Sequence, residues 1–168
     1  MSTDRKVIEF VVPGEVRGKM RPKASAFSGH ARMYTPAKQV EYENWVKLCY
    51  FKETKTKDPI FRRGTPIAIE ILVKMAVPKS VSKKKRDLML KGNILPETKP
   101  DVDNAAKSIL DALNGLAYDD DAMVTMLTIA KVYSTDSLAY VKIWEDTDDK
   151  KEDRYLEEYT KNGVLTES

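Results

Sequence analysis

Residues 67–77, IAIEILVKMAV, carry the clearest structural pattern in the chain. Apolar residues occupy every odd position of this segment, and residues of mixed polarity occupy the even positions. A period of two is typical of a β-strand that buries one face. Pro78 then ends the pattern, because proline cannot donate to a strand ladder. The segment therefore predicts a central strand.

The residues before this strand predict another strand, a loop and a helix. Residues 7–12 form an apolar run that indicates a strand, whereas residues 14–35 are broken by glycine and proline and indicate an irregular loop. Thr35-Pro36 predicts a helix start with Thr35 as the N-cap. The apolar face of this helix is predicted at Tyr42, Trp45, Val46 and Cys49. The polar residues 53–66 predict a connection, which we expect to be mobile. We also expect these residues to be an insertion.

The residues after the central strand predict two helices and two strands. A short basic helix is expected from Ser80 or Ser82 to Leu90, and a second helix over residues 104–113. Residues 123–133 and 138–144 predict strands, joined as a hairpin through residues 134–137. Because strands and helices interleave without regular alternation, we expect an α+β fold. Its small mixed, mostly antiparallel sheet would carry helices packed on one face.

The composition predicts one soluble domain. The chain has 168 residues, of which 42% are hydrophobic and 33% are charged. We expect this domain over residues 1–147 and a charged C-terminal tail over residues 148–168, where seven acidic residues face four basic ones. The single cysteine, Cys49, excludes an intramolecular disulfide, and no segment has the length and apolarity of a membrane span. A cytoplasmic protein without a membrane partner follows as an expectation.

Two groups of basic residues give the chain its positive charge. They are Arg17, Lys19, Arg21 and Lys23 in the predicted loop, and Lys83, Lys84 and Lys85 in the basic helix. Such groups attract polyanions, of which nucleic acid is the commonest. A solvated charged face explains the same residues, and charge alone favours this plainer interpretation.

Two acidic groups flank the helix predicted at residues 104–113. Asp101 and Asp103 precede it, and the triplet 119–121 follows it. Carboxylates gathered at one point repel one another, and a hard divalent cation such as Mg²⁺ relieves that repulsion. The chemistry of such a site is phosphodiester hydrolysis. The alternative is structural, because aspartate is also a common helix cap and turn residue, and spacing alone favours that alternative.

Lys107 has two interpretations as well. It lies one helical turn after Asp103, so an ion pair with Asp103 or Asp111 is the structural one. In the functional one, the ammonium holds a phosphate beside a metal. The residues alone favour the ion pair. Cys49 is interpreted as a packing residue, and a single histidine, His30, makes a zinc site improbable.

These motifs resemble the RusA family of Holliday junction resolvases. The resemblance rests on the segment KPDVDN (99–104), Lys107, the segment LDALNG (110–115) and Asp120-Asp121. Pro13-Gly14 and the basic segment 19–23 are similar to the basic entry loop of that family. The resemblance runs from about Phe10 to Trp144.

The resemblance implies a metal-dependent homodimer that nicks four-way DNA junctions in symmetric pairs and is often encoded by phages or prophages. It implies Mg²⁺ as the cofactor, with Mn²⁺ as a substitute, held by Asp101, Asp103 and the second acid of the Asp120-Asp121 pair. Asp121 is preferred, because the next strand then begins in register, although Asp120 remains the alternative. Lys107 matches the catalytic lysine of the family. The basic residues named above would contact DNA.

Two other functions remain open at this stage. A non-catalytic protein that binds branched DNA would use the basic loops alone. A small Mg²⁺-dependent nucleotide or phosphate hydrolase would use the carboxylates without any need for a junction.

Overall fold

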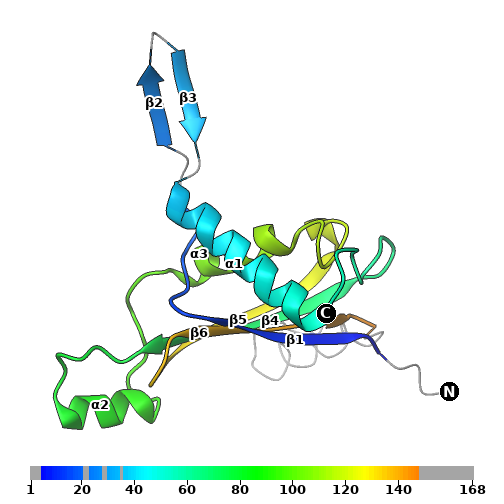
Figure 1. Cartoon of the computed structure of the whole chain (residues 1–168). Helices are drawn as coiled ribbons and strands as arrows, with labels where there is room; N and C mark the ends of the chain where they lie inside the picture. The colour runs from blue at the N-terminus through cyan, green and yellow to red at the C-terminus, as the bar shows by residue number, and fades with distance from the viewer. Residues whose placement is uncertain (1–4, 21–22, 28–29, 35, 148–168) are drawn as a thin grey trace, which may run out of the picture.

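A four-stranded mixed sheet forms the centre of the protein (Figure 1). The computed structural model describes residues 5–20, 23–27, 30–34 and 36–147; of 23–27 and 30–34, only the backbone is described. The strands β1 (Val7–Pro13), β4 (Ile67–Ala76), β5 (Val124–Ser134) and β6 (Leu138–Glu145) lie in the order β1-β6-β4-β5. The pairs β1–β6 and β6–β4 are antiparallel, whereas β4 and β5 are parallel. The α+β fold with a mostly antiparallel mixed sheet is thus confirmed.

The predicted hairpin between β5 and β6 is wrong. β4 lies between these two strands and pairs with both. Residues 135–137 instead cross the end of β4, where Ala76 N donates to Ser137 Oγ (3.0 Å) and Val77 N donates to Ser134 O (3.0 Å). These bonds satisfy amides that the end of β4 would otherwise leave open.

Two helices cover one face of the sheet. They are α1 (Ala37–Thr54) and α3 (Val102–Leu113), and the buried residues of both join those of the sheet in one core (Figure 1). α2 (Lys83–Leu90) has Ser82, one of the two predicted N-caps, at its start, and the Oγ of Ser82 accepts from Lys85 N at 3.3 Å. α2 and α3 lie in the crossover that the parallel pair β4–β5 requires. No helix among the described residues is long and apolar enough to cross a membrane.

The first helix differs from its prediction in its start and its buried face. α1 begins at Ala37 with Pro36 as the N-cap, and Thr35 lies outside the described residues. The face that it buries is Gln39, Tyr42, Val46 and Tyr50. Trp45 is 41% exposed, because its indole N–H reaches sideways to Pro13 O at 2.8 Å instead of entering the core.

The loop predicted at residues 14–35 contains two strands. β2 (Lys23–Phe27) and β3 (His30–Tyr34) pair in antiparallel register and stand away from the sheet at the start of α1 (Figure 1). The irregular-loop prediction is therefore wrong over these residues. The prediction failed because the segment is short and rich in alanine and serine, which leaves no apolar alternation to read.

Candidate metal and nucleic-acid site

The first acidic group lies at the N-terminal end of α3. Asp101 occupies the N-cap position, but its side chain makes no capping hydrogen bond. Asp103 lies in the first turn of the helix and is exposed, as Asp101 is. The capping interpretation therefore does not account for either carboxylate. Lys107 is exposed one turn further on, and no ion pair involves it within the described part of the chain.

The segment that leads into Asp101 is fixed by a lysine from β5. Lys131 Nζ donates to Thr98 O at 2.7 Å and to Pro100 O at 3.0 Å. Lys131 pairs with Val73 in the parallel ladder, so it lies on the buried face of the sheet, between Ile129 and the end of the strand. A cation on this face needs polar partners, and the two carbonyl oxygens supply them. Lys131 thereby holds the backbone that carries Asp101.

A second contact brings the basic loop against the same end of α3. A Cβ on Gly18 would lie 3.0 Å from the Cβ of Pro100 and 3.2 Å from that of Asn104, so a larger residue would push the loop away. Lys19 N also donates to Asn104 O at 2.9 Å. The absence of a side chain at Gly18 thus lets the loop pack directly on the start of α3.

A groove of about 770 Å³ lies between this loop and α3. Its lining includes four basic residues, Arg17, Lys19, Lys38 and Lys99, together with Asp101 and Asn104. Glu15 also lines the groove and pairs with Arg17 at 3.8 Å, so Asp101 is the lining carboxylate without an ion pair among the described residues. Such a mixture suits a polyanion that is bound together with a cation, because the lysines and arginines attract phosphates while the carboxylate attracts the metal.

Lys19 is already paired within the chain. Its ammonium forms ion pairs with Glu43 (3.1 Å) and with Asp111. Burial opposes the charged form of Lys19, but hydrogen bonds to Asp111 and Glu43 outweigh this effect and raise the pKa of the ammonium. Gln39, which is fully buried, supports the arrangement by accepting from Met20 N and donating to Glu43 Oε1 at 2.7 Å. Lys19 therefore fixes the loop, and Asp111 pairs with Lys19 rather than with Lys107 among the described residues.

The second acidic group lies at the other end of α3 and is held by two arginines. Asp119 accepts from Arg62 Nη1 (3.3 Å) and from Arg63 N (2.8 Å). Asp120 accepts from Arg63 Nη2 (2.9 Å) and from Ala122 N (3.0 Å). The bond from Ala122 N, with contributions from Asp121 and the Arg63 charge, lowers the pKa of the Asp120 carboxyl. Asp121 is exposed and has no ion pair among the described residues.

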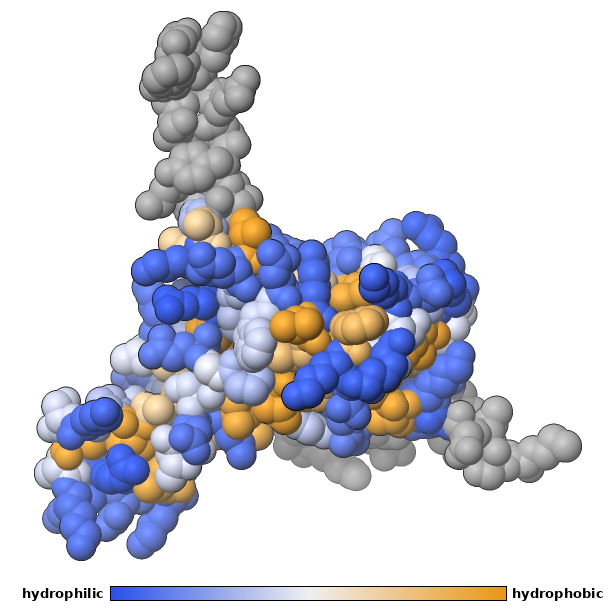
Figure 2. Space-filling view, in the orientation of Figure 1, coloured by the Kyte–Doolittle hydropathy of each residue, from blue (hydrophilic) through white to orange (hydrophobic). Residues whose placement is uncertain are grey.

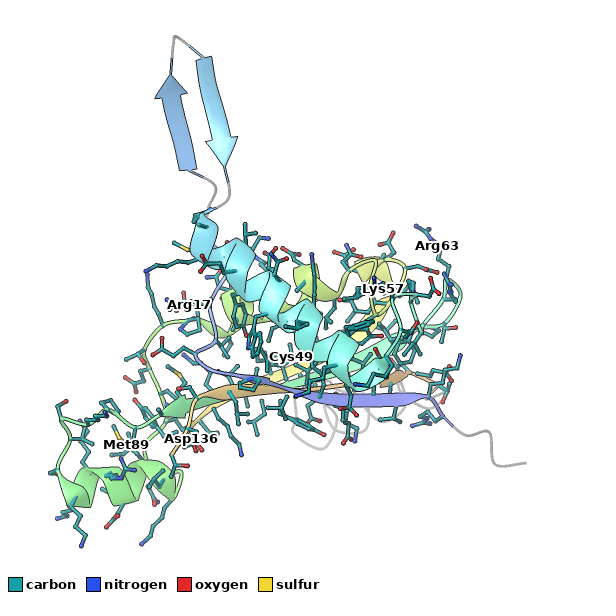
Figure 3. All side chains as sticks on the ribbon, in the orientation of Figure 1. Arg17, Cys49, Lys57, Arg63, Met89 and Asp136 are labelled. Atoms are coloured by element: carbon teal, nitrogen blue, oxygen red, sulfur yellow. The ribbon has the colours of Figure 1, made fainter. Side chains whose placement is uncertain are left out.

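The two acidic groups do not meet within one chain. α3 has 12 residues and therefore an axis of roughly 18 Å. Lys131, beside the Asp101 segment, pairs with Val73, whereas Val124, just after Asp121, pairs with Ile67, which is about 20 Å away along β4. Figure 3 places Arg17 and Arg63 toward opposite ends of the helical layer. Within the described residues, no three His, Cys, Asp or Glu side chains lie close enough to hold a metal ion.

Of the other residues predicted to bind DNA, the three lysines of α2 lie at the same end of the molecule as the groove (Figure 1). Lys83, Lys84 and Lys85 are exposed in the first turn of α2, a helix whose surface carries both hydrophilic and hydrophobic residues (Figure 2). Arg21 lies outside the described residues, and for Lys23 only its backbone place in β2 is described. The tail predicted at residues 148–168 also lies outside them.

Three residues at the site were not predicted from the sequence. Arg62 and Arg63 belong to the polar connection at residues 53–66, which was interpreted as mobile. Lys131 had a detectable signal, because it interrupts the alternation of a predicted strand at an inward position.

Comparison with known proteins agrees with these motifs. The family model of the endodeoxyribonuclease RusA matches residues 13–144. A Bacillus subtilis (strain 168) protein, described as uncharacterized protein YqaN, is 38% identical over 140 residues, which cover 82% of this chain and 96% of the relative. The family match spans β4, β5, all but the last residue of β6, and the helices α1, α2 and α3, but only the last residue of β1. The chain therefore belongs to the RusA endodeoxyribonuclease family.

Proposed function

We propose that the protein is a magnesium-dependent endodeoxyribonuclease that resolves Holliday junctions or other branched DNA by paired nicks. The observation that carries the proposal is the state of Asp101 and Asp103. Both carboxylates are exposed, neither forms an ion pair in the described part of the chain, and Asp101 lines a groove rich in basic residues. Carboxylates without a structural partner in such a groove are available to a metal ion that also contacts phosphate.

The donor chemistry fits Mg²⁺, with Mn²⁺ as a substitute. Asp101, Asp103 and Asp121 offer carboxylate oxygens, which are the ligands that hard divalent cations prefer. Asp121 is a better third ligand than Asp120, since Asp120 is occupied by Arg63 and Ala122. When bound, the metal would activate water and stabilise charge at the scissile phosphate. Lys107, which forms no ion pair within the described part of the chain, would hold that phosphate, and Arg17 and Lys99 would orient the DNA backbone.

A homodimer would complete this site. Because Asp101 and Asp103 lie at the N-terminal end of α3 and Asp121 follows the turn beyond its C-terminal end, we infer that each metal binds Asp101 and Asp103 of one protomer and Asp121 of its partner. A two-fold axis across the helical layer provides two such sites, and two nicks of opposite strands require two active centres. The protein would then act in the cytoplasm at the nucleoid, where DNA of a bacterium or an integrated phage is available.

Nicking of a synthetic four-way junction tests the activity. The wild-type protein with Mg²⁺ should produce symmetric nicks, and Asp103→Asn should bind the junction without cutting it. Asp58→Asn, at an exposed aspartate that belongs to neither acidic group, serves as the control and should cut normally. Equal cutting by Asp103→Asn would refute the assignment. Binding without product at any metal concentration would instead support a non-catalytic branched-DNA-binding protein, and cleavage of free nucleotides a small hydrolase.

Mixing two inactive variants tests the shared site. If the site is shared, a dimer of one Asp103→Asn and one Asp121→Asn chain keeps one intact centre, and roughly half of the dimers in an equal mixture are of this kind. The mixture should therefore nick one strand of each junction. A mixture of Asp101→Asn and Asp103→Asn leaves no intact centre and should stay inactive. Failure of the first mixture to nick, with heterodimers shown to form, would refute the shared arrangement.

A further inference from the structure

The polar link at residues 55–66 lies directly against the turn that carries the second acidic group. Ile60 N and Phe61 N both donate to Ala117 O at 3.1 Å, and Phe61 forms an isolated bridge with Tyr118. The Phe61 side chain is 1% exposed and belongs to the core. The link is therefore anchored at this point by backbone bonds and by a buried aromatic ring. It brings the next two residues, both arginines, to the edge of the turn.

The two arginines neutralise two of the three consecutive aspartates. Asp119 is fixed by two donors, the backbone N–H of Arg63 and the guanidinium of Arg62. Asp120 is fixed by the guanidinium of Arg63 on one oxygen and by Ala122 N on the other. Both carboxylates thus have a partner from the link or the turn itself. Three adjacent carboxylates repel one another, and the arginine and backbone donors reduce that repulsion at Asp119 and Asp120.

We propose that Arg62 and Arg63 are positioning residues that hold Asp119 and Asp120 so that Asp121 alone is presented to the metal. The inference rests on the proposed function, in which Asp121 is a ligand. The arginines themselves touch neither metal nor DNA in this scheme. Their guanidinium groups engage carboxylates on both sides of one turn, which fixes the direction in which the next side chain leaves the backbone. Residues that orient a metal ligand in this way affect metal affinity more than the rate at saturating metal.

The discriminating variant is Arg63→Ala, because it removes the guanidinium from Asp120 and keeps the backbone N–H that donates to Asp119. The Mn²⁺ concentration for half-maximal nicking should rise about tenfold or more, whereas the rate at saturating Mn²⁺ and the affinity for the junction should change little. Arg63→Lys, which keeps the backbone bond and a cation, should recover part of the shift. Lys57→Ala is the matched control: it removes a cation from the same link, and Lys57 instead lies over the Phe51 ring.

Two outcomes would overturn the proposal. An unchanged metal midpoint in Arg63→Ala would show that the contact does not orient Asp121. A loss of junction affinity with an unchanged midpoint would assign Arg63 to DNA contact instead.

Amide hydrogen exchange separates this proposal from the proposed function. Loss of Arg63 frees Asp120, so the Ala122 amide that Asp120 holds should exchange faster in Arg63→Ala and not in Lys57→Ala. If the wild-type protein does not nick junctions but Arg63→Ala still speeds this exchange, the positioning role of Arg63 stands and the nuclease assignment fails. If the wild-type protein nicks junctions and Arg63→Ala changes neither the amide exchange nor the metal midpoint, the nuclease assignment stands and the positioning role of Arg63 fails.

Discussion

The two ends of α3 hold acidic side chains in different ways. At the N-terminal end, Lys131 bonds the carbonyl oxygens of Thr98 and Pro100 and leaves both Asp101 and Asp103 without an ion pair among the described residues. At the C-terminal end, Arg62 and Arg63 bond two carboxylates directly. Of the three aspartates there, only Asp121 has no ion pair among the described residues. A cation from a distant segment fixes the chain in both places.

The difference shows how a chain with many aspartates can leave only a few of them, at defined positions, free of ion pairs. Where the acids are separated, as at 101 and 103, holding the backbone is sufficient. Where three acids are adjacent, two must be neutralised before the third acts alone. Both solutions keep the free carboxylates exposed, which a shared site between two protomers requires.

The largest effect is expected from a cavity under the helix that separates the two ends. Ile109 is fully buried in the core, so Ile109→Ala should lower the free energy of unfolding by about 2–5 kcal/mol. Val102→Ala, at a residue of the same helix that is 42% exposed, should cost less than about 1 kcal/mol. Urea unfolding measures both. Equal costs would mean that α3 is not the fixed spacer on which the comparison depends.

Lys131→Met should disrupt the site at the N-terminal end of α3 and leave the C-terminal end unchanged. It removes two hydrogen bonds from an ammonium group, and we expect a loss of about 1.5 kcal/mol in the free energy of unfolding. Junction nicking should fall about tenfold, because the segment that carries Asp101 is no longer held in place. Lys47→Met, at an exposed lysine of α1, is the control. Thermal unfolding and nicking rates would be measured together; normal values for both would remove Lys131 from the site.

Much of this comparison was accessible from the sequence. The alternation at β4 and the apolar face of α3 predicted both elements, because each depends on a period within one segment. The sequence also placed Asp101 just before this helix and Lys107 within it, whereas Asp103, predicted to precede the helix, lies in its first turn. Each of these predictions uses only local information.

The remaining features depend on contacts between distant segments. Ser134–Ser137 suited a hairpin, yet the same residues cross the end of β4, since alternation predicts a strand and not its neighbour. The polar composition of the link at 53–66 predicted mobility, whereas Arg62 and Arg63 find their partners more than fifty residues later. The distance between Asp101 and Asp121 depends on the register in which β5 pairs with β4. That register cannot be read from the spacing of residues along the chain.

The smallest effect should distinguish the two ends by their response to salt. Arg17 lines the groove beside Asp101, and its ion pair with Glu15 is long (3.8 Å) and exposed, so its guanidinium is available to a phosphate. Arg17→Ala should weaken junction binding modestly and reduce the slope of log affinity against log salt by about one, because one fewer counterion is released. Arg63→Ala should leave that slope unchanged, since its guanidinium is paired with Asp120. Binding titrations at several salt concentrations, without metal, measure both slopes. A reduced slope in Arg63→Ala would mean that the C-terminal end of α3 also contacts DNA through its arginines, whereas an unchanged slope in Arg17→Ala would remove the groove from the interface.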